Sequence, residues 1–351
     1  MKLIRYGLLL VLALAACDAP PAPAPGPRPI SCAAGTITAQ GSSAQAAAVN
    51  AWIRNYQISC PQATIAYDSV GSGAGVAGFI GGTGDFAGTD SPLSPADQPA
   101  ANARCGTGPA IHLPMVVGPI ALAYNVAGVG DLRLRPATVA KIFAGTVTSW
   151  NDPAIAADNP RAVLPSTTIR TVHRSDSSGT TDNFLKFLTT AAGDWTYGSG
   201  KVWPAPGGGA EKGSNGVSAR VAETDGAIGY VESSYAQFHD LHTAAIGNGA
   251  GEFVTLTDAA AGRTVAGAKA ASAGDLRLTI DYRAPVSGAY PIVLVTYEVV
   301  CGRGTAALVK SFLTYTSSEA GQAAITRLGY APLPSGLRAR VAAAIAGITV
   351  R

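Results

Sequence analysis

Charged residues are scarce in this chain of 351 residues: Asp, Glu, Lys and Arg make up 13% of it, against 47% for the hydrophobic types. This scarcity excludes an intrinsically disordered chain, because such chains combine low hydrophobicity with high charge. The formal net charge is +3, and Lys2 and Arg5 contribute two of the positive charges near the N-terminus. The remaining 23 basic residues, 25 minus these two, nearly balance the 22 acidic ones, so no nucleic-acid partner is expected.

Motifs for metal and redox chemistry are also missing. The chain has no C-x-x-C pair, and its four histidines are scattered apart from His239 and His242. That pair lacks a carboxylate or cysteine at ligand spacing, which favours two surface residues over a metal site. No metal or other cofactor is therefore expected.

The first sixteen residues, MKLIRYGLLLVLALAA, combine a basic start with a short apolar run. The run has the length of a secretory signal and is too short for an ordinary membrane span. The next residue completes Leu14-Ala15-Ala16-Cys17, which resembles the lipobox of bacterial lipoproteins, where the cysteine is lipidated. The alternative is an ordinary cleavage site beside a chance cysteine. We expect residues 1–16 to be a signal peptide and the exported chain to be lipid-anchored to the cell membrane, outside the cytoplasm.

Residues 17–35 form the expected anchor and linker. A proline- and alanine-rich tract from Asp18 to Ser31 favours extended polyproline geometry. At about 3.1 Å per residue such a tract reaches roughly 40 Å, which suits a soluble body held off a membrane. Four cysteines remain after Cys17, an even number in an oxidising compartment, so one or two disulfides are expected with their pairing left open. They are Cys32, Cys60, Cys105 and Cys301.

Strand-like and helical stretches alternate along the body of the chain. After the strand-like GTITAQ, apolar residues recur at helical spacing in Val49, Trp52, Ile53 and Tyr56, which predicts an amphipathic helix capped by Ser42 or Ser43. Strand, helix and strand patterns follow in ATIAYDSV, GSGAGVAGFIGG and GDFAGTD. A second alternating series includes PATVAKIFAG, TIRTVHR, TTDNFLKFL and GAIGYVE, and the long apolar YPIVLVTYEVV precedes helical stretches near Leu308 and Leu337. The pattern predicts an α/β fold with two lobes.

Three places share one arrangement, in which a strand ends, small hydrogen-bond donors follow and a helix begins. They are Gly41-Ser42-Ser43, Gly71-Ser72-Gly73 and Ser177-Ser178-Gly179-Thr180. The first N–H groups of a helix are unpaired and carry about half a positive charge, so each helix start is suited to bind an anion. Each is weak evidence alone, because such residues also cap ordinary helices. Three together predict an oxyanion site.

Three charged residues accompany these turns. Arg174 supplies a fork of donors that matches phosphate oxygens, and Asp176 is placed to hold its guanidinium in one rotamer. Asp90 ends GDFAGTD and would face the ligand. A carboxylate accepts the proton that phosphate keeps near neutral pH, whereas sulfate has no proton to give, so Asp90 would select against sulfate. The alternative for Asp90 is a turn or helix cap.

Long blocks of the chain resemble the Pst-type phosphate-binding proteins of bacterial ABC phosphate importers, especially actinobacterial ones. In order, they are GSGAGVAGFIGGTGDFAGTDSPLS, KIFAGTVTSWNDPAIAADNP, VHRSDSSGTTDNF, GAIGYVE and YPIVLVTYEVV. The resemblance spans about residues 36 to 345. It implies a periplasmic-binding-protein-like fold of type II, in which crossing strands join two α/β lobes around a phosphate. Lobe one is expected to comprise residues 36–118 and 292–351, and lobe two residues 119–291.

The resemblance also implies which residues contact phosphate: Ser43, the Ala44 backbone, Ser72, Asp90, Arg174, Ser178, Gly179 and Thr180, with Asp176 supporting Arg174. Many relatives carry Thr-Phe or Thr-Leu where this chain has Ser43-Ala44, which puts in question how tightly that corner closes. His173 replaces an arginine of some relatives and is expected to pack. Phe143 and Trp150 are expected in the core or on a partner surface. The expected protein is a non-catalytic monomer that passes phosphate to permease subunits.

Three other functions compete with this interpretation. Residues 73–78 match G-x-G-x-x-G, the dinucleotide fingerprint, but Asp90 follows too early and export argues against a nicotinamide cofactor. A secreted phosphatase would use the same hydroxyls, but His173, Asp176 and Ser178 are sequence neighbours and no G-x-S-x-G motif occurs. The third alternative is a binding protein for sulfate, molybdate or an organic phosphate. Asp90 is the residue that discriminates this alternative from a binding protein for inorganic phosphate.

Overall fold

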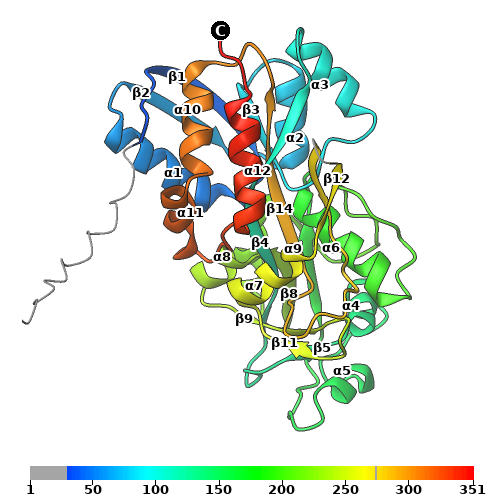
Figure 1. Cartoon of the computed structure of the whole chain (residues 1–351). Coiled ribbons are helices and arrows are strands. Elements are labelled where there is room, and N and C mark those ends of the chain that lie inside the picture. The colour runs from blue at the N-terminus through cyan, green and yellow to red at the C-terminus, as the bar shows by residue number, and fades with distance from the viewer. Residues whose placement is uncertain (1–29, 273–274) are drawn as a thin grey trace, which may run out of the picture.

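The structure is a computed structural model that describes residues 30–272 and 275–351 (Figure 1). The predicted signal peptide, Cys17 and residues 17–29 of the linker lie outside the described residues. None of the helices in the described part of the chain is long and apolar enough to cross a membrane.

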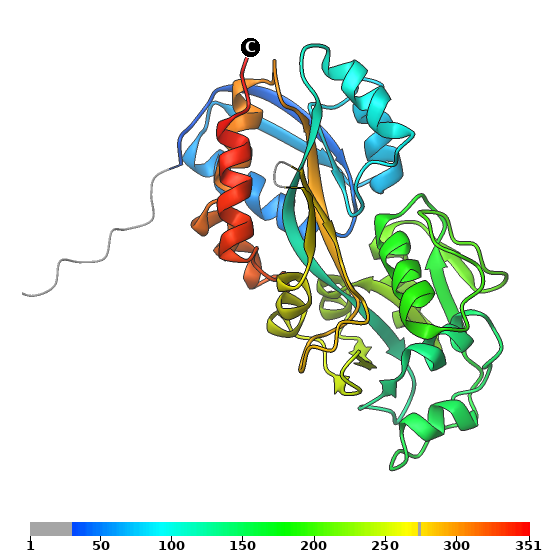
Figure 2. The ribbon, with the colours of Figure 1, turned by 45° about the vertical axis from the view of Figure 1, so that its right-hand side comes forward.

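One large mixed sheet organises the molecule, with the strand order β2-β1-β3-β14-β4-β8-β6-β7 and β9 beside β4. The first part of β4 (Ala110–Asn125) pairs antiparallel with β14 (Val293–Cys301), and its last part pairs with β8 (Ala227–Glu232). β4 therefore belongs to both halves of the sheet. Figure 2 shows β4 and β14 running between the two parts of the molecule.

We call the two parts lobe one and lobe two. Lobe one is built on three parallel strands, β1 (Gly35–Gly41), β2 (Ala63–Asp68) and β3 (Phe86–Thr89), with the helices α1 (Ala46–Ser59), α2 (Ser72–Ile80), α3 (Asp97–Cys105), α10 (Ala307–Thr316), α11 (Glu319–Thr326) and α12 (Ser335–Ala346). Lobe two is built on β6 (Arg170–Arg174), β7 (Gly209–Glu211) and β8, with α4 (Pro136–Phe143), α5 (Pro153–Asp158), α6 (Gly179–Phe187), the π-helical turn η1 (Leu188–Ala192), α7 (Gly213–Glu223), α8 (Ser233–Phe238) and α9 (Asp258–Ala266). The remaining strands are short: β5 (Arg133–Leu134), β9 (His242–Thr243), β10 (Ala245–Gly247), β11 (Phe253–Val254), β12 (Lys269–Ser272) and β13 (Asp275–Thr279).

The architecture confirms the predicted two-lobed α/β fold. All nine residues of β14 are buried, as expected of a nearly continuous apolar run in the middle of a sheet. The predicted apolar face of α1 is also buried, with Trp52 and Tyr56 fully enclosed. The lobe boundaries expected at 118/119 and 291/292 coincide with a position in β4 and the residues just before β14. The exact division stays a prediction.

The predicted cap of α1 is wrong. The helix begins at Ala46, its N-cap position is Gln45, and no side chain caps it. The Ser42 hydroxyl instead accepts a bond from the Ala44 amide at 3.1 Å, which makes a tight turn before the helix. The Ser43 hydroxyl lies 3.1 Å from the Ser214 hydroxyl of lobe two. The Ser43 side chain, which was predicted to cap the helix, therefore makes a contact between the lobes instead.

Phe143 and Trp150 lie in the core, with exposures of 2% and 0%. Trp150 donates its indole N–H to the carbonyl of Gly226 at 3.0 Å, and Phe143 packs on Phe184. These two residues therefore have a packing role in lobe two, which was one of the two predicted alternatives.

Two disulfides complete lobe one. Cys32 pairs with Cys60, so the chain leaving the linker is tied to the end of α1, and Cys105 pairs with Cys301, joining α3 to the end of β14. This resolves the pairing that the sequence left open.

Removing the second disulfide should destabilise the protein more than removing the first. The paired cysteines are 196 residues apart in Cys105–Cys301 and 28 apart in Cys32–Cys60. In the chain-entropy description the longer loop stabilises by about 1.7 kcal/mol more, because it restricts the unfolded chain more. Denaturant unfolding of Cys105→Ala/Cys301→Ala beside Cys32→Ala/Cys60→Ala measures this difference. Equal losses would show that local strain or contacts outweigh loop entropy.

Candidate anion-binding site

The three predicted donor turns come together where lobe one meets lobe two. α2 begins directly after Gly71, α6 begins after Ser178, and the Ser43 turn follows β1. The Gly73 amide of α2 donates to the Ser177 carbonyl across the interface at 2.9 Å. We refer to the eight predicted contact residues as the polar cluster; all of them are buried, and none of the seven side-chain-bearing members is more than 4% exposed.

Asp90 lies at the centre of the polar cluster, one residue beyond β3. The hydroxyls of Ser72 and Thr180 donate to its Oδ2 at 3.3 and 3.4 Å, and Thr296 of β14 donates to its Oδ1 at 2.7 Å. Burial raises the pKa of Asp90, although hydrogen bonds from Ser42 and Thr296 and the charge of Arg174 oppose the shift. The carboxylate is thus held by hydroxyls from both lobes.

Gly179 is required by how closely the lobes approach at Asp90. A Cβ at position 179 would lie 2.6 Å from the Asp90 Cβ and 2.7 Å from the Ser72 hydroxyl. Gly71 is constrained in the same way, because its φ is +96° and a Cβ there would lie 2.3 Å from Asp176 Oδ2. These two glycines let the helix starts of opposite lobes touch.

Arg174 ends β6 and is 2% exposed. Its Nε and Nη2 donate to the two carboxylate oxygens of Asp176 at 2.7 and 2.6 Å, in a bidentate pair. Burial alone would raise the pKa of Asp176, but the hydrogen bonds and charge of Arg174, with the Gly213 amide, outweigh it and lower that pKa. The guanidinium is therefore held in one orientation by an ionised partner, with Nη1 left directed at Ser214 at 3.5 Å.

Two further members of the polar cluster make hydrogen bonds within their own lobes. The Ser178 hydroxyl caps α6 by accepting from the Thr181 amide at 3.1 Å, and the Ala44 amide donates to Ser42. The Ala44 carbonyl accepts from Tyr330 at 2.7 Å. Among the described hydrogen bonds, Ser43 is connected to Arg174 through Ser214, whose hydroxyl lies 3.1 Å from that of Ser43 and 3.5 Å from Arg174 Nη1.

Sequence reasoning missed residues that complete the site. Ser214 is the second residue of α7, shortly after the strand β7, so the same order of strand end, small donor and helix start occurs a fourth time. Thr296 lies on β14, where it and Glu298 are polar positions two apart in an apolar run. That spacing puts both on one face of the strand and was a readable signal. Tyr235 of α8 donates to the Ser43 carbonyl at 2.7 Å.

His173 packs, as predicted. Its ring stacks on Trp203 with centroids 5.0 Å apart, and its Nδ1 lies 3.1 Å from the Arg174 carbonyl oxygen.

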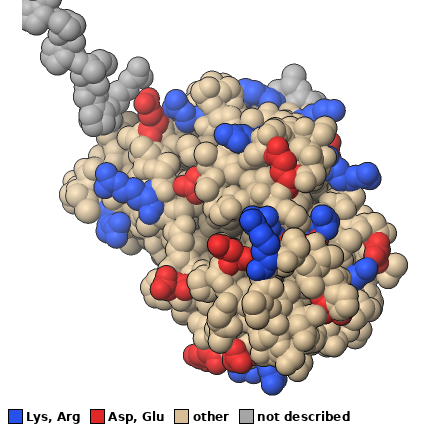
Figure 3. Space-filling view, turned by 90° about the horizontal axis from the view of Figure 1, so that it is seen from below, with Lys and Arg blue, Asp and Glu red and all other residues tan. Residues whose placement is uncertain are grey.

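Among the described residues, no group of three or more His, Cys, Asp or Glu side chains is placed to hold a metal ion. The face seen from below carries Lys and Arg side chains interspersed with Asp and Glu (Figure 3).

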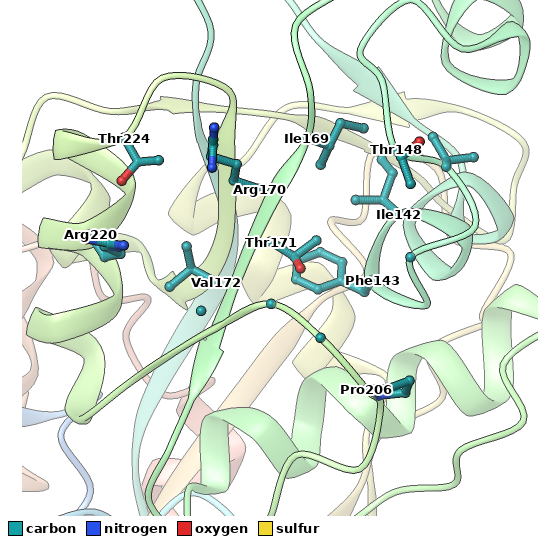
Figure 4. A pocket seen from close by; sticks show the side chains of 15 residues that line it. Ile142, Phe143, Thr148, Ile169, Arg170, Thr171, Val172, Pro206, Arg220 and Thr224 are labelled. Atoms are coloured by element: carbon teal, nitrogen blue, oxygen red, sulfur yellow. The ribbon is translucent and has the colours of Figure 1, made fainter.

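A separate concavity lies on lobe two. It has a volume of about 360 Å³ and is lined by residues including Phe143, Arg170, Thr171 and Arg220 (Figure 4). Arg170 is the first residue of β6 and Arg174 the last, so this pocket lies at the opposite end of the strand from the polar cluster. Ligands of α/β sheets bind at the carboxyl ends of strands, which favours the polar cluster as the site.

Comparison with known proteins gives one consistent result. Residues 26–320 match the PBP superfamily domain. Over 324 residues the chain is 44% identical to the phosphate-binding protein PstS 3 of Mycobacterium tuberculosis, covering 89% of this chain and 86% of that protein, and it is 43% identical over 318 residues to PstS 3 of Mycobacterium leprae, covering 88% and 86%. A solved periplasmic phosphate-binding protein with bound phosphate shares the fold at a TM-score of 0.69 and 23% identity, covering 88% of this chain and 93% of the other. A phosphate ABC transporter substrate-binding protein of Clostridium perfringens aligns at a TM-score of 0.62 and 18% identity, covering 86% and 100%.

Proposed function

Because this chain belongs to the Pst-type phosphate-binding proteins, we propose that it binds inorganic phosphate outside the cytoplasmic membrane and delivers it to an ABC-type permease. The observation that carries the proposal is the meeting of three helix-start turns around Arg174 and Asp90 at the interface of the lobes. The relatives' names supply the ligand, and the polar cluster supplies a chemistry suited to it.

Arg174 provides the charge that a buried anion needs. Moving an ion into a low-dielectric interior costs several kcal/mol or more unless its charge and lone pairs are met. Two of the guanidinium nitrogens are already held by Asp176, so the arginine loses little side-chain freedom when a ligand arrives. Nη1 is the nitrogen directed towards the Ser43 side of the interface, through Ser214.

Asp90 provides discrimination between phosphate and sulfate. Its carboxylate is surrounded by hydroxyl donors and lies where a bound anion would meet both lobes. A protonated phosphate oxygen can donate to this carboxylate, whereas a sulfate oxygen can only repel it. This supports inorganic phosphate over sulfate and molybdate as the cargo.

Binding is proposed to be non-covalent, without turnover. The polar cluster is buried, so phosphate enters when the lobes separate and leaves when they separate again. His173, the histidine beside Arg174 in the sequence, stacks on Trp203 and does not act as a base in this proposal. The hydroxyls of Ser72 and Thr180 donate to Asp90 in the described structure; in this proposal each turns its single O–H group to the anion when it binds, and neither acts as a nucleophile.

We propose that lipidation of Cys17 anchors the chain, as a monomer, on the outer face of the membrane. The described chain leaves the linker beside α1 and α10 of lobe one, where the Ser31 carbonyl accepts from Ser311 and the Cys32–Cys60 disulfide follows. The tether thus attaches to lobe one on the helices α1 and α10, which leaves the lobe interface free for phosphate exchange.

Calorimetric titration tests the proposed function. Residues 17–351 carrying Cys17→Ser, stripped of co-purified anion, are titrated with phosphate and with sulfate at neutral pH. We expect phosphate binding with a Kd at or below about 1 μM, near −8 kcal/mol, and no heat with sulfate. Equal binding of sulfate would contradict the proposed cargo. Silence to both anions, with release of phosphate from a chromogenic monoester, would favour the phosphatase instead.

A further inference from the structure

The first turn of α6 continues past the polar cluster with Asp182 and Asn183, which the proposed phosphate site does not use. Both are buried, at 7% and 5% exposure, and neither points towards the Arg174–Asp176 pair in any hydrogen bond of the described structure. A buried carboxylate and a buried amide on one helical turn need partners. Each of them has a hydrogen-bond partner on the other lobe.

Asp182 reaches Ser91, two residues beyond β3 of lobe one. The Ser91 hydroxyl donates to Asp182 Oδ2 at 2.5 Å, and Lys186, one turn further along α6, donates to the same oxygen at 2.6 Å. Ser91 is 3% exposed, so this contact between lobes is enclosed. The ion pair with Lys186 lies within α6 and its lysine is 42% exposed, whereas the bond from Ser91 crosses between the lobes.

Asn183 reaches the neighbouring residue of the same segment. Its Nδ2 donates to the backbone carbonyl of Asp90 at 2.7 Å and to the Gly179 carbonyl at 2.9 Å. Its Oδ1 accepts from Tyr282 at 3.0 Å, which fixes the orientation of the amide. The segment Asp90–Ser91 of lobe one is therefore bound at two successive residues by two successive residues of lobe two.

We propose that Asp182 and Asn183 are positioning residues that latch lobe two onto the Asp90–Ser91 segment, and so determine how long phosphate stays bound. The proposal rests on the proposed function. Neither residue touches the ligand in this account: they act by stabilising the closed arrangement in which Asp90 faces Arg174. Because the contacts form only when the lobes meet, they slow phosphate release and leave its entry into separated lobes unchanged.

A double-mutant cycle across the interface tests the latch. Ser91→Ala, Asp182→Ala and the double variant are loaded with radiolabelled phosphate and chased with unlabelled phosphate, and Kd is measured by calorimetry. We expect koff to rise about tenfold or more in each variant, since a hydrogen bond to a charged group is lost, with kon unchanged. The double variant should release phosphate no faster than Asp182→Ala alone, because both changes remove one contact.

Two matched variants separate the latch from local structure. Ser94→Ala removes a hydroxyl from lobe one shortly after the Asp90–Ser91 segment, but this hydroxyl donates to Asp97 within the same lobe. Lys186→Ala removes the other partner of Asp182 and leaves the bond between lobes. Both should keep koff within about twofold of the unsubstituted chain. Thermal unfolding without phosphate should also be unchanged for Ser91→Ala.

Each outcome decides a different claim. If the increases in koff of the two single variants multiplied in the double variant, or if koff were unchanged in Ser91→Ala, the latch would be overturned. Phosphate binding itself would remain established. A fall in kon with unchanged koff would equally overturn it. Failure of the unsubstituted chain to bind phosphate would overturn the proposed function, and the latch with it.

Discussion

Arg174→Ala should weaken phosphate binding by about 30- to 5,000-fold, corresponding to about 2–5 kcal/mol. The arginine is buried and would be the cation facing a desolvated anion, so its removal leaves the ligand charge without its partner. It also leaves the negative charge of Asp176 near the ligand without the guanidinium that balances it. Calorimetric titration of the variant measures the loss.

Two variants control this experiment. Arg170→Ala changes an exposed arginine at the opposite end of the same strand and should leave the Kd unchanged. Arg174→Lys keeps the charge and loses the planar fork, so its affinity should lie between those of the unsubstituted chain and Arg174→Ala. An unchanged Kd in Arg174→Ala, with the fold retained, would remove Arg174 from the site.

Asp90→Asn should reduce the preference for phosphate over sulfate by about 100-fold. The carboxylate accepts the phosphate proton as a charged hydrogen bond worth about 1.5–3 kcal/mol, and the amide substitutes a donor that no longer repels sulfate. Competition between the two anions measures the ratio. Asp85→Asn is the matched control, because Asp85 lies just before β3, binds the Thr38 amide and carries the same charge. Retained selectivity in Asp90→Asn would show that the proton-acceptor account is wrong.

Because Asp90 repels sulfate only as a carboxylate, the preference for phosphate over sulfate should depend on pH. Burial raises the pKa of Asp90 above its ordinary value of 3.8, so the carboxyl takes up a proton at a higher pH than an exposed aspartate does. A protonated Asp90 donates a hydrogen bond and no longer repels sulfate. The preference for phosphate over sulfate should therefore decline as the pH falls from neutral, and the decline should begin at a higher pH than it would for an exposed aspartate. The Asp90→Asn variant should show a flat profile over this range, which isolates the contribution of Asp90.

Much of the site follows from local sequence pattern. Strand ends, small donors and helix starts are local features, and α2 and α6 begin at Ser72 and Gly179, inside the predicted donor stretches 71–73 and 177–180. Asp176 lies two residues after Arg174, so the bidentate pair needed only a turn to form. The predicted cap of α1 was wrong for the opposite reason. The Ser43 hydroxyl has a partner 171 residues away, which no local preference encodes.

The remaining parts of the site depend on contacts between lobes. Ser214 follows a strand of three residues in a glycine-rich stretch, too short for an alternating pattern to identify. Ser91 and Asp182 are 91 residues apart in the chain and become partners only because β3 ends and α6 begins at the same interface. Burial of hydroxyls on both sides of an interface has no periodic signature, so these residues became visible only in the folded chain.

A crystal structure of the phosphate-loaded chain tests the central claim most directly. The account predicts one phosphate enclosed between the lobes, with its oxygens about 2.7–3.2 Å from the Arg174 guanidinium, the Ser72 and Thr180 hydroxyls and an Asp90 carboxylate oxygen. It also predicts that the Ser91–Asp182 contact persists beside it. Phosphate bound elsewhere, such as in the pocket at Arg170 and Arg220, or an interface closed without phosphate in a chain that binds it in solution, would contradict the account.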